Sequence, residues 1–124
     1  SEAEFSIDSA IFSNLINQLK IFGDTIEIQC TEDKIILHSI SIEAGKMVVD
    51  INIDDLTEYS ITEGEVMKLS FSLSMLHNIC MYNKIAKEIE VHLINEFPMK
   101  IKYLLGDDGA SFTFYLAPKI GDDD

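Results

Sequence analysis

The sequence lacks arginine and tryptophan, and it has only two cysteines, two prolines and six glycines among its 124 residues. It also lacks a long hydrophobic run, because every apolar stretch falls far short of the roughly 20 residues that a membrane-spanning helix needs. No signal-peptide pattern opens the chain, so we expect a protein that stays inside the cell and has no membrane partner. A chain of this length with 47% hydrophobic residues is sufficient for one compact domain with a single core.

Residues that could bind a metal or form a disulfide are few and widely spaced. Cys30 and Cys80 lie in apolar runs without a CxxC pattern, so we predict two reduced core residues in preference to a disulfide or a metal pair. The three histidines, His38, His77 and His92, show no ligand spacing. There is no glycine-rich phosphate loop. We therefore expect neither a metal nor another cofactor.

The charge of the chain is strongly one-sided. Its 22 acidic residues stand against nine basic ones, all of them lysine, which gives a formal net charge of −13. A uniformly acidic surface repels nucleic acid at long range, so charge alone argues against DNA binding. That conclusion depends on where the acidic residues lie.

Two segments of the chain, FSIDSAIFSNLI and LSFSLSMLHNIC, repeat one pattern at an offset of 64 positions. In each segment a short alternating strand runs into a residue that can cap a helix, Asp8 or Ser72. The apolar residues then change to helical spacing, which predicts helices over residues 9–22 and 72–84. Ile11 is among the positions predicted to face the core.

Period-two alternation follows each helix and predicts three strands in each half. The expected strands are TIEIQC, KIILHSISI and KMVVDINI in the first half, and EIEVHLI, MKIKYLL and ASFTFYLAP in the second. We therefore predict an α+β fold made of a tandem βαβββ repeat, with two helices packed on one face of antiparallel sheets. Residues 1–124 would form a single domain.

The two predicted helices are free of carboxylates, which is the strongest physical signal in the sequence. They contain no aspartate or glutamate, although glutamate is a better helix former than the serines and asparagines found there. Chance is the alternative explanation. The residues predicted to form one polar, neutral to weakly basic face are Ser13, Asn14, Asn17, Lys20, Ser74, His77, Asn78, Met81, Lys84 and Lys87. Such a face can lie near the phosphates of duplex DNA without gripping them.

The same face carries no arginine and no aromatic platform, so it is not suited to reading base sequence or to stacking on single strands. A few lysines give only weak, salt-sensitive affinity for DNA. A protein with so little attraction for DNA must be held there by topology.

Three stretches, IFGDTIEIQC, FPMKIKYLLGDDG and FYLAPKIGDDD, resemble the C-terminal domain of the eukaryotic-type DNA sliding clamps, the proliferating cell nuclear antigen family. The resemblance covers nearly the whole chain. It implies a DNA polymerase processivity factor without enzymatic activity, in which three subunits of two such domains close into a ring around duplex DNA. Helices would line the hole. The N-terminal clamp domain and the interdomain connector are then absent from this chain, which would be one sixth of the ring.

The resemblance also implies partners and a place of action. A clamp loader, DNA polymerase and other proteins with clamp-binding motifs would act on a homotrimer of the full-length protein, in the nucleus or at a viral replication site. This fragment alone is expected to be monomeric. The alternatives are a checkpoint-type clamp subunit and an acidic protein-interaction module without direct DNA contact.

The family docks a short partner motif on its outer face. The matching positions here are Pro98, Tyr115, Ala117, Pro118, Lys119 and Ile120. Pro118 is expected to end pairing with the domain's own sheet and to leave the following backbone free for a visiting chain. Without the resemblance, a frayed terminus with a solubilising acidic tail explains the same residues.

Ring closure in the family uses edge strands. The matching residues are Lys46, Met47, Val48, Val49, Asp50 and Ile51. Their apolar run is one that an isolated edge strand normally avoids, which favours a subunit contact. An internal strand buried on both faces is the alternative.

The helix face departs from the family at four positions. Family members commonly carry arginine or lysine there, where this chain has Asn14, Asn17, Ser74 and Met81. DNA contact from this domain is therefore expected to be weak, and the absent half of the subunit would carry more of it.

Adjacent carboxylates are the closest approach to a catalytic motif in the sequence. Two such pairs, at residues 54–55 and 107–108, are considered as candidates. Acid–base catalysis needs such groups in a pocket, whereas both pairs are more simply explained as solvated turn residues. We therefore predict that the protein is not an enzyme.

Overall fold

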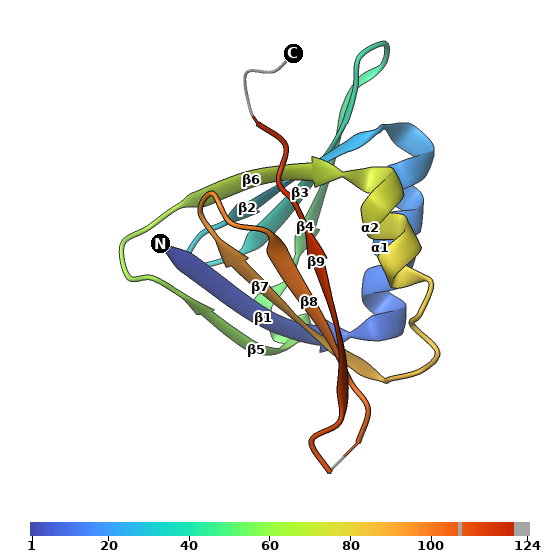
Figure 1. Ribbon diagram of the computed structural model, residues 1–124. Coiled ribbons are helices and arrows are strands. Elements are labelled where there is room, and N and C mark those ends of the chain that lie inside the picture. Colours follow the sequence, from blue (N-terminus) through green and yellow to red (C-terminus); the bar gives the residue numbers. More distant parts are fainter. Residues whose placement is uncertain (107, 121–124) are drawn as a thin grey trace.

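The computed structural model describes residues 1–106 and 108–120, and Figure 1 shows its architecture. Two α-helices lie side by side, and two antiparallel sheets extend away from them. The elements follow the order β1 (Glu2–Asp8), α1 (Ser9–Phe22), β2 (Thr25–Cys30), β3 (Ile35–Ser41), β4 (Gly45–Ile51), the 3-10 helix η1 (Ile53–Asp55), β5 (Leu56–Ile61), β6 (Met67–Ser72), α2 (Leu73–Cys80), β7 (Glu88–Ile94), β8 (Met99–Leu104) and β9 (Ser111–Leu116). Asp107 and the acidic tail, residues 121–124, lie outside the described residues.

The strands form a five-stranded sheet in the order β5-β1-β7-β8-β9 and a four-stranded sheet in the order β4-β3-β2-β6. Each sheet takes strands from both halves of the chain, because β1 pairs with β7 and β2 pairs with β6. The predicted α+β fold with a tandem βαβββ repeat is confirmed, and the two repeats are interleaved.

Each helix begins at its predicted cap. The Asp8 carboxylate accepts hydrogen bonds from the N–H groups of Ala10 and Ile11, at 2.9 and 3.1 Å. The Ser72 hydroxyl accepts one from the N–H group of Met75, at 3.3 Å. α1 contacts β1 and β3, and α2 contacts β6 and β9, so the helix pair spans both sheets. In the part of the chain that the structure describes, no helix is long and apolar enough to cross a membrane.

α2 is shorter than predicted. The sequence predicts a helix over residues 72–84, but α2 ends at Cys80 and turns follow it. The Ser9 hydroxyl of α1 donates a hydrogen bond to the carbonyl of Asn83, at 2.9 Å, and the Ser9 N–H group donates one to the carbonyl of Lys87, at 2.8 Å. These bonds to α1 hold the segment in a non-helical path.

The sequence did not predict β5. Its apolar residues Leu56, Tyr59 and Ile61 do not alternate strictly, because the pairing of β5 with β1 shifts register between Ser6 and Ile7. This bulge sets an extra residue of β5 against β1 and so breaks the period-two signal.

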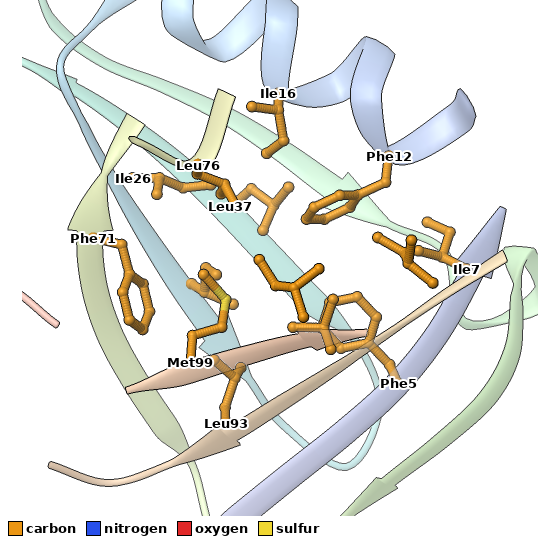
Figure 2. Packing of buried hydrophobic residues seen from close by; sticks show 14 of the residues in the cluster. Phe5, Ile7, Phe12, Ile16, Ile26, Leu37, Phe71, Leu76, Leu93 and Met99 are labelled. Atoms are coloured by element: carbon orange, nitrogen blue, oxygen red, sulfur yellow. The ribbon is translucent and has the colours of Figure 1, made fainter. Parts of the chain in front are cut away.

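The core lies between the sheets and beneath the helices (Figure 2). Phe12 and Ile16 of α1 point towards the strands, as does Leu76 of α2. They meet strand residues such as Phe5 and Leu37, and all five side chains are fully buried. Burial of this one contiguous cluster fixes the position of both helices on the sheets.

The end of α1 packs closely on β3. A Cβ atom at Gly23 would lie 2.4 Å from the carbonyl oxygen of Ile40, so the backbones can approach this closely only with glycine at that position. The Ser39 hydroxyl donates a hydrogen bond to the carbonyl of Leu19, at 2.7 Å. These contacts fix the last turn of α1, which carries Lys20.

Both cysteines are buried and free, as predicted. Burial raises the pKa of the Cys30 thiol from 9.0 to about 11 and that of Cys80 from 9.0 to about 12, so the reactive thiolate is disfavoured. At about pH 8 we expect iodoacetamide to leave both thiols unmodified in the folded protein and to alkylate both in urea. Equal rates of thiol alkylation with and without urea would contradict this prediction.

The same pKa shifts predict a loss of stability in alkali. Above pH 9.0 the unfolded chain loses thiol protons that the folded protein keeps. The free energy of unfolding should therefore fall as the pH rises towards 11, by up to about 1.4 kcal/mol per pH unit for each thiol.

Candidate nucleic-acid interface and docking surface

The exposed side of the two helices carries nearly all the residues predicted to face DNA. Asn14, Asn17, Lys20, Ser74, Asn78, Met81, Lys84 and Lys87 are exposed, and His77 is half-buried. Neither α1, nor α2, nor residues 81–87 contain an acidic residue. We call this surface the helix face. It is neutral to weakly basic on a strongly acidic chain.

The predicted exposure of Ser13 is wrong. Its side chain is only 8% exposed. Ser13 lies one helical turn after Ser9, whose hydroxyl proton is shared between the carbonyls of Asn83 and Ala86, the latter 2.5 Å away. Both serines therefore lie on the side of α1 that packs against α2 and the segment after it. A small side chain permits this close packing, and Ser13 is not part of the exposed surface of the helices.

Positive charge lies at two separate places on the helix face. Lys20, in the last turn of α1, lines a shallow groove with Asn17 and His77. Lys84 and Lys87 line a second depression beside the N-terminus of α1. At 1.5 Å per residue, the two places are roughly 16 Å apart along the helix. The helix face can therefore attract phosphates at two points and not along a continuous basic stripe.

Apolar side chains occupy much of the remaining helix face, and the sequence reasoning missed most of them. Ile11 is 47% exposed and Met75 is 56% exposed, and they accompany Met81. The prediction that Ile11 faces the core is wrong, because Phe12 and Ile16 take the buried stripe of α1. The excess of apolar positions on both helices was the signal that could have revealed this feature.

One carboxylate, that of Asp8, borders the helix face in the depression that Lys84 and Lys87 line, and others lie elsewhere on the domain. On β1, Glu2 and Glu4 alternate with buried residues and so point away from the core, as does Glu90 on β7. One carboxylate oxygen of Glu2 is 3.1 Å from Nε2 of His92. Within residues 1–106 and 108–120, no group of three His, Cys, Asp or Glu side chains could hold a metal ion. The strands β1 and β7 therefore present carboxylates away from the core, whereas α1, α2 and residues 81–87 contribute none to the helix face.

Three of the predicted docking residues, Pro98, Tyr115 and Ala117, lie at one end of the β8–β9 ladder, and Pro118, Lys119 and Ile120 follow in the chain. The register of this ladder places Pro98 beside Ala117, immediately beyond the last pair. Tyr115 and Ile120 are 66% and 68% exposed, and Pro118 is half-buried. We call these five apolar and aromatic residues, Pro98, Tyr115, Ala117, Pro118 and Ile120, the docking surface.

The backbone after Pro118 is less free than predicted. β9 does end before Pro118, at Leu116. However, the N–H group of Lys119 donates a hydrogen bond to the carbonyl of Ser70 on β6, at 2.8 Å. Its Nζ donates another to the hydroxyl of Thr25 on β2, at 2.7 Å. The alternative of a frayed terminus therefore does not describe the chain as far as Lys119.

β4 carries the predicted subunit-contact residues. Among the described strands it pairs with β3 alone, so the alternative of an internal strand is wrong. Lys46, Val48 and Asp50 are exposed, while Met47 and Val49 are half-buried against the core. Ile51 is only 4% exposed, so its side chain serves the core of its own domain and is not available to a neighbour.

β9 is an edge strand of the other sheet, and it carries an aromatic cluster that the sequence reasoning missed. The ring of Phe114 lies 6.4 Å from that of Phe112 and 5.3 Å from that of Tyr82. Phe112 and Tyr82 are exposed. Alternation in SFTFY was the available signal, and exposed aromatic residues on a free edge indicate a contact with another protein surface.

Comparison with known proteins agrees with this arrangement. A sequence model of the family described as proliferating cell nuclear antigen, C-terminal domain, matches residues 2–119. The proliferating cell nuclear antigen of Chaetomium thermophilum is 30% identical over 128 residues, which cover 98% of this chain and 48% of the relative. DNA polymerase sliding clamp 2 of Pyrobaculum aerophilum is 26% identical over 121 residues, which cover 96% of this chain and 46% of the relative.

A solved structure shares the fold. The crystal structure of a PCNA2–PCNA3 complex from Sulfolobus tokodaii matches with a TM-score of 0.82 and 22% identity, over 94% of this chain and 47% of that chain. The chain spans about half the length of the curated relatives that it matches. The family match extends over nearly the whole chain, from β1 to Lys119. This chain therefore belongs to the C-terminal domain family of proliferating cell nuclear antigen.

Proposed function

We propose that this domain is part of a DNA polymerase processivity factor, a ring that encircles duplex DNA and docks replication and repair proteins. The observation that carries the proposal is the absence of acidic residues from the helix face of a chain with a net charge of −13. Duplex DNA is a polyanion, so each carboxylate on a protein surface beside it makes the contact between protein and DNA less favourable. In this role the protein is a scaffold and not an enzyme.

Attraction from the helix face alone is too small to hold DNA. Its lysines are Lys20, Lys84 and Lys87, and three phosphate contacts correspond to a salt slope of roughly −3. Retention on DNA at physiological salt therefore depends on a closed ring, which holds the duplex whatever the affinity.

The edge strands support ring closure. A closed ring assembled head to tail needs two different surfaces on each unit. β4 offers one free edge and β9, with its aromatic cluster, offers another. We infer that residues 46–50 contact the neighbouring subunit, that the full-length protein is a homotrimer, and that this fragment alone is monomeric. The Sulfolobus tokodaii structure, a complex of two clamp chains, supports assembly into a multimer.

The docking surface is proposed to receive the short motif of DNA polymerase, the clamp loader and other partners. Its exposed Tyr115 and Ile120 can cover a hydrophobic plug, and the chain beside them can pair with an extended peptide backbone. For the place of action we propose the nucleus, which the eukaryotic relative from Chaetomium thermophilum supports.

The proposed ring can be tested by comparing how much protein stays on circular DNA and on linear DNA. After loading of the full-length protein onto a nicked plasmid, we expect most of it to remain through gel filtration at about 0.5 M salt, where charge attraction is screened. Cutting the plasmid once should release it, because the ring slides off the ends. The amount of protein that co-elutes with DNA is the measurement, and equal retention on circular and linear DNA would favour an acidic interaction module.

A variant with Val48→Lys distinguishes the ring from other causes of retention. Val48 is 53% exposed on the β4 edge, so the domain should tolerate lysine there, whereas a subunit contact should not. We expect the Val48→Lys protein to be a monomer by light scattering and not to be retained on the circular plasmid. Ser60→Lys, on exposed β5, is the matched control and should leave a trimer.

A further inference from the structure

The segment that follows β9 leaves the five-stranded sheet and attaches to the four-stranded one. In Figure 1 this segment continues from the end of β9 past β6. Lys119 makes both of the described attachments, through its N–H group to the carbonyl of Ser70 and through Nζ to the hydroxyl of Thr25. Ser70 is on β6, the edge strand, and Thr25 is on the adjoining strand β2. Lys119 therefore joins the C-terminal segment to two neighbouring strands.

The residues around Lys119 have little else to order them. Ala117 and Ile120 are exposed and lie outside any strand. Pro118 restricts its own backbone but has no N–H group with which to pair. An exposed terminal segment of this kind is normally poorly ordered unless it is tied down. The two hydrogen bonds of Lys119 supply that tie.

We propose that Lys119 is a positioning residue for the docking surface and not a contact residue for the partner motif. Its two bonds fix the backbone next to Ile120, so that the segment is ordered before a partner arrives. Preorganisation of this kind strengthens binding because the segment does not have to be ordered when the partner binds. This inference rests on the proposed docking function and changes the role first predicted for Lys119.

A direct contact role for Lys119 makes a different prediction. If its positive charge attracted an acidic partner, the charge alone would matter and Thr25 would be irrelevant. If the bond to Thr25 positions the segment, removal of either the donor or the acceptor weakens binding by the same route. Thr25 carries no charge, and its substitution separates the two roles.

The test measures binding of a fluorescent clamp-binding motif peptide to the full-length protein. We expect Lys119→Met and Thr25→Val each to weaken binding about threefold, and the double variant to weaken it no further than either single one. Lys34→Met, at an exposed lysine in the β2–β3 turn, is the matched control and should bind as the wild type does. Amide hydrogen exchange of Lys119 should be slow in the wild type and faster in Thr25→Val.

Three outcomes overturn the inference. Wild-type affinity and slow exchange in Thr25→Val, with weakened binding in Lys119→Met, would make Lys119 a contact residue. If the fold-loss of affinity in the double variant equals the product of the two single losses, the two residues act independently. If the wild-type protein does not bind the peptide at all, the proposed docking function fails, and the positioning role fails with it.

Discussion

Deletion of residues 118–124 from the full-length protein is expected to weaken its binding to a clamp-binding motif peptide by roughly 100-fold. The deletion removes the exposed side chain of Ile120, which the peptide would bury, together with backbone groups able to pair with the peptide. Burial of an isoleucine contributes about 1.5–3 kcal/mol and a hydrogen bond about 0.5–1.5 kcal/mol, and about 1.4 kcal/mol corresponds to tenfold in affinity. Isothermal titration with the same peptide measures the loss.

Two shorter changes show which part of the segment matters. Deletion of residues 121–124 alone keeps Ile120 and should change the affinity less than threefold, because salt screens repulsion or attraction by the charges of these aspartates. Ile120→Ala should give an intermediate loss. Wild-type affinity after deletion of residues 118–124 would place the docking surface elsewhere on the molecule. The domain should remain folded in all three variants, because Ile120 is exposed and outside the core.

The fold could be predicted where local signals and tertiary packing agree. Asp8 and Ser72 cap the helices as their sequence positions indicate, and the alternating strands appear as expected. The prediction failed where a distant part of the chain decides the local structure. The segment after Cys80 has helical spacing but is held in turns by bonds from Ser9. β5 was missed because a bulge against β1 interrupts its alternation.

The candidate site was predictable as a face but less so residue by residue. Absence of acidic residues identified the helix face, since charge is recorded directly in the sequence. The sequence does not specify how α1 is rotated about its own axis. Ser13 was therefore predicted to be exposed and Ile11 to be buried, whereas the structure has the reverse. The bonds of Lys119 to Ser70 and Thr25 join residues far apart in the chain, and no local pattern reports them.

In the proposed ring, the distribution of charge limits what this domain would contribute to DNA binding. Lysines lie at the two ends of α1, and neutral and apolar side chains occupy the rest of the helix face. Such a surface would neither hold the duplex tightly nor repel it, which suits the proposed ring. In this account the helix face is important for the carboxylates that it lacks more than for the lysines that it has.

The most direct test of that claim returns carboxylates to the helix face. Asn17→Glu and Ser74→Glu change exposed helical positions, and glutamate is a better helix former than either residue, so the domain should remain stable. Ser60→Glu and Asn95→Glu add the same charge at exposed positions on β5 and in the β7–β8 turn. The measurement is the affinity of the full-length protein for a short linear duplex at low salt, because a ring cannot hold linear DNA by topology. We predict a loss of affinity of about tenfold or more for the helix-face pair, because each added charge repels nearby phosphates, and wild-type affinity for the control pair. Equal affinity of the two pairs, whether high or low, would contradict the claim that the helices face the duplex.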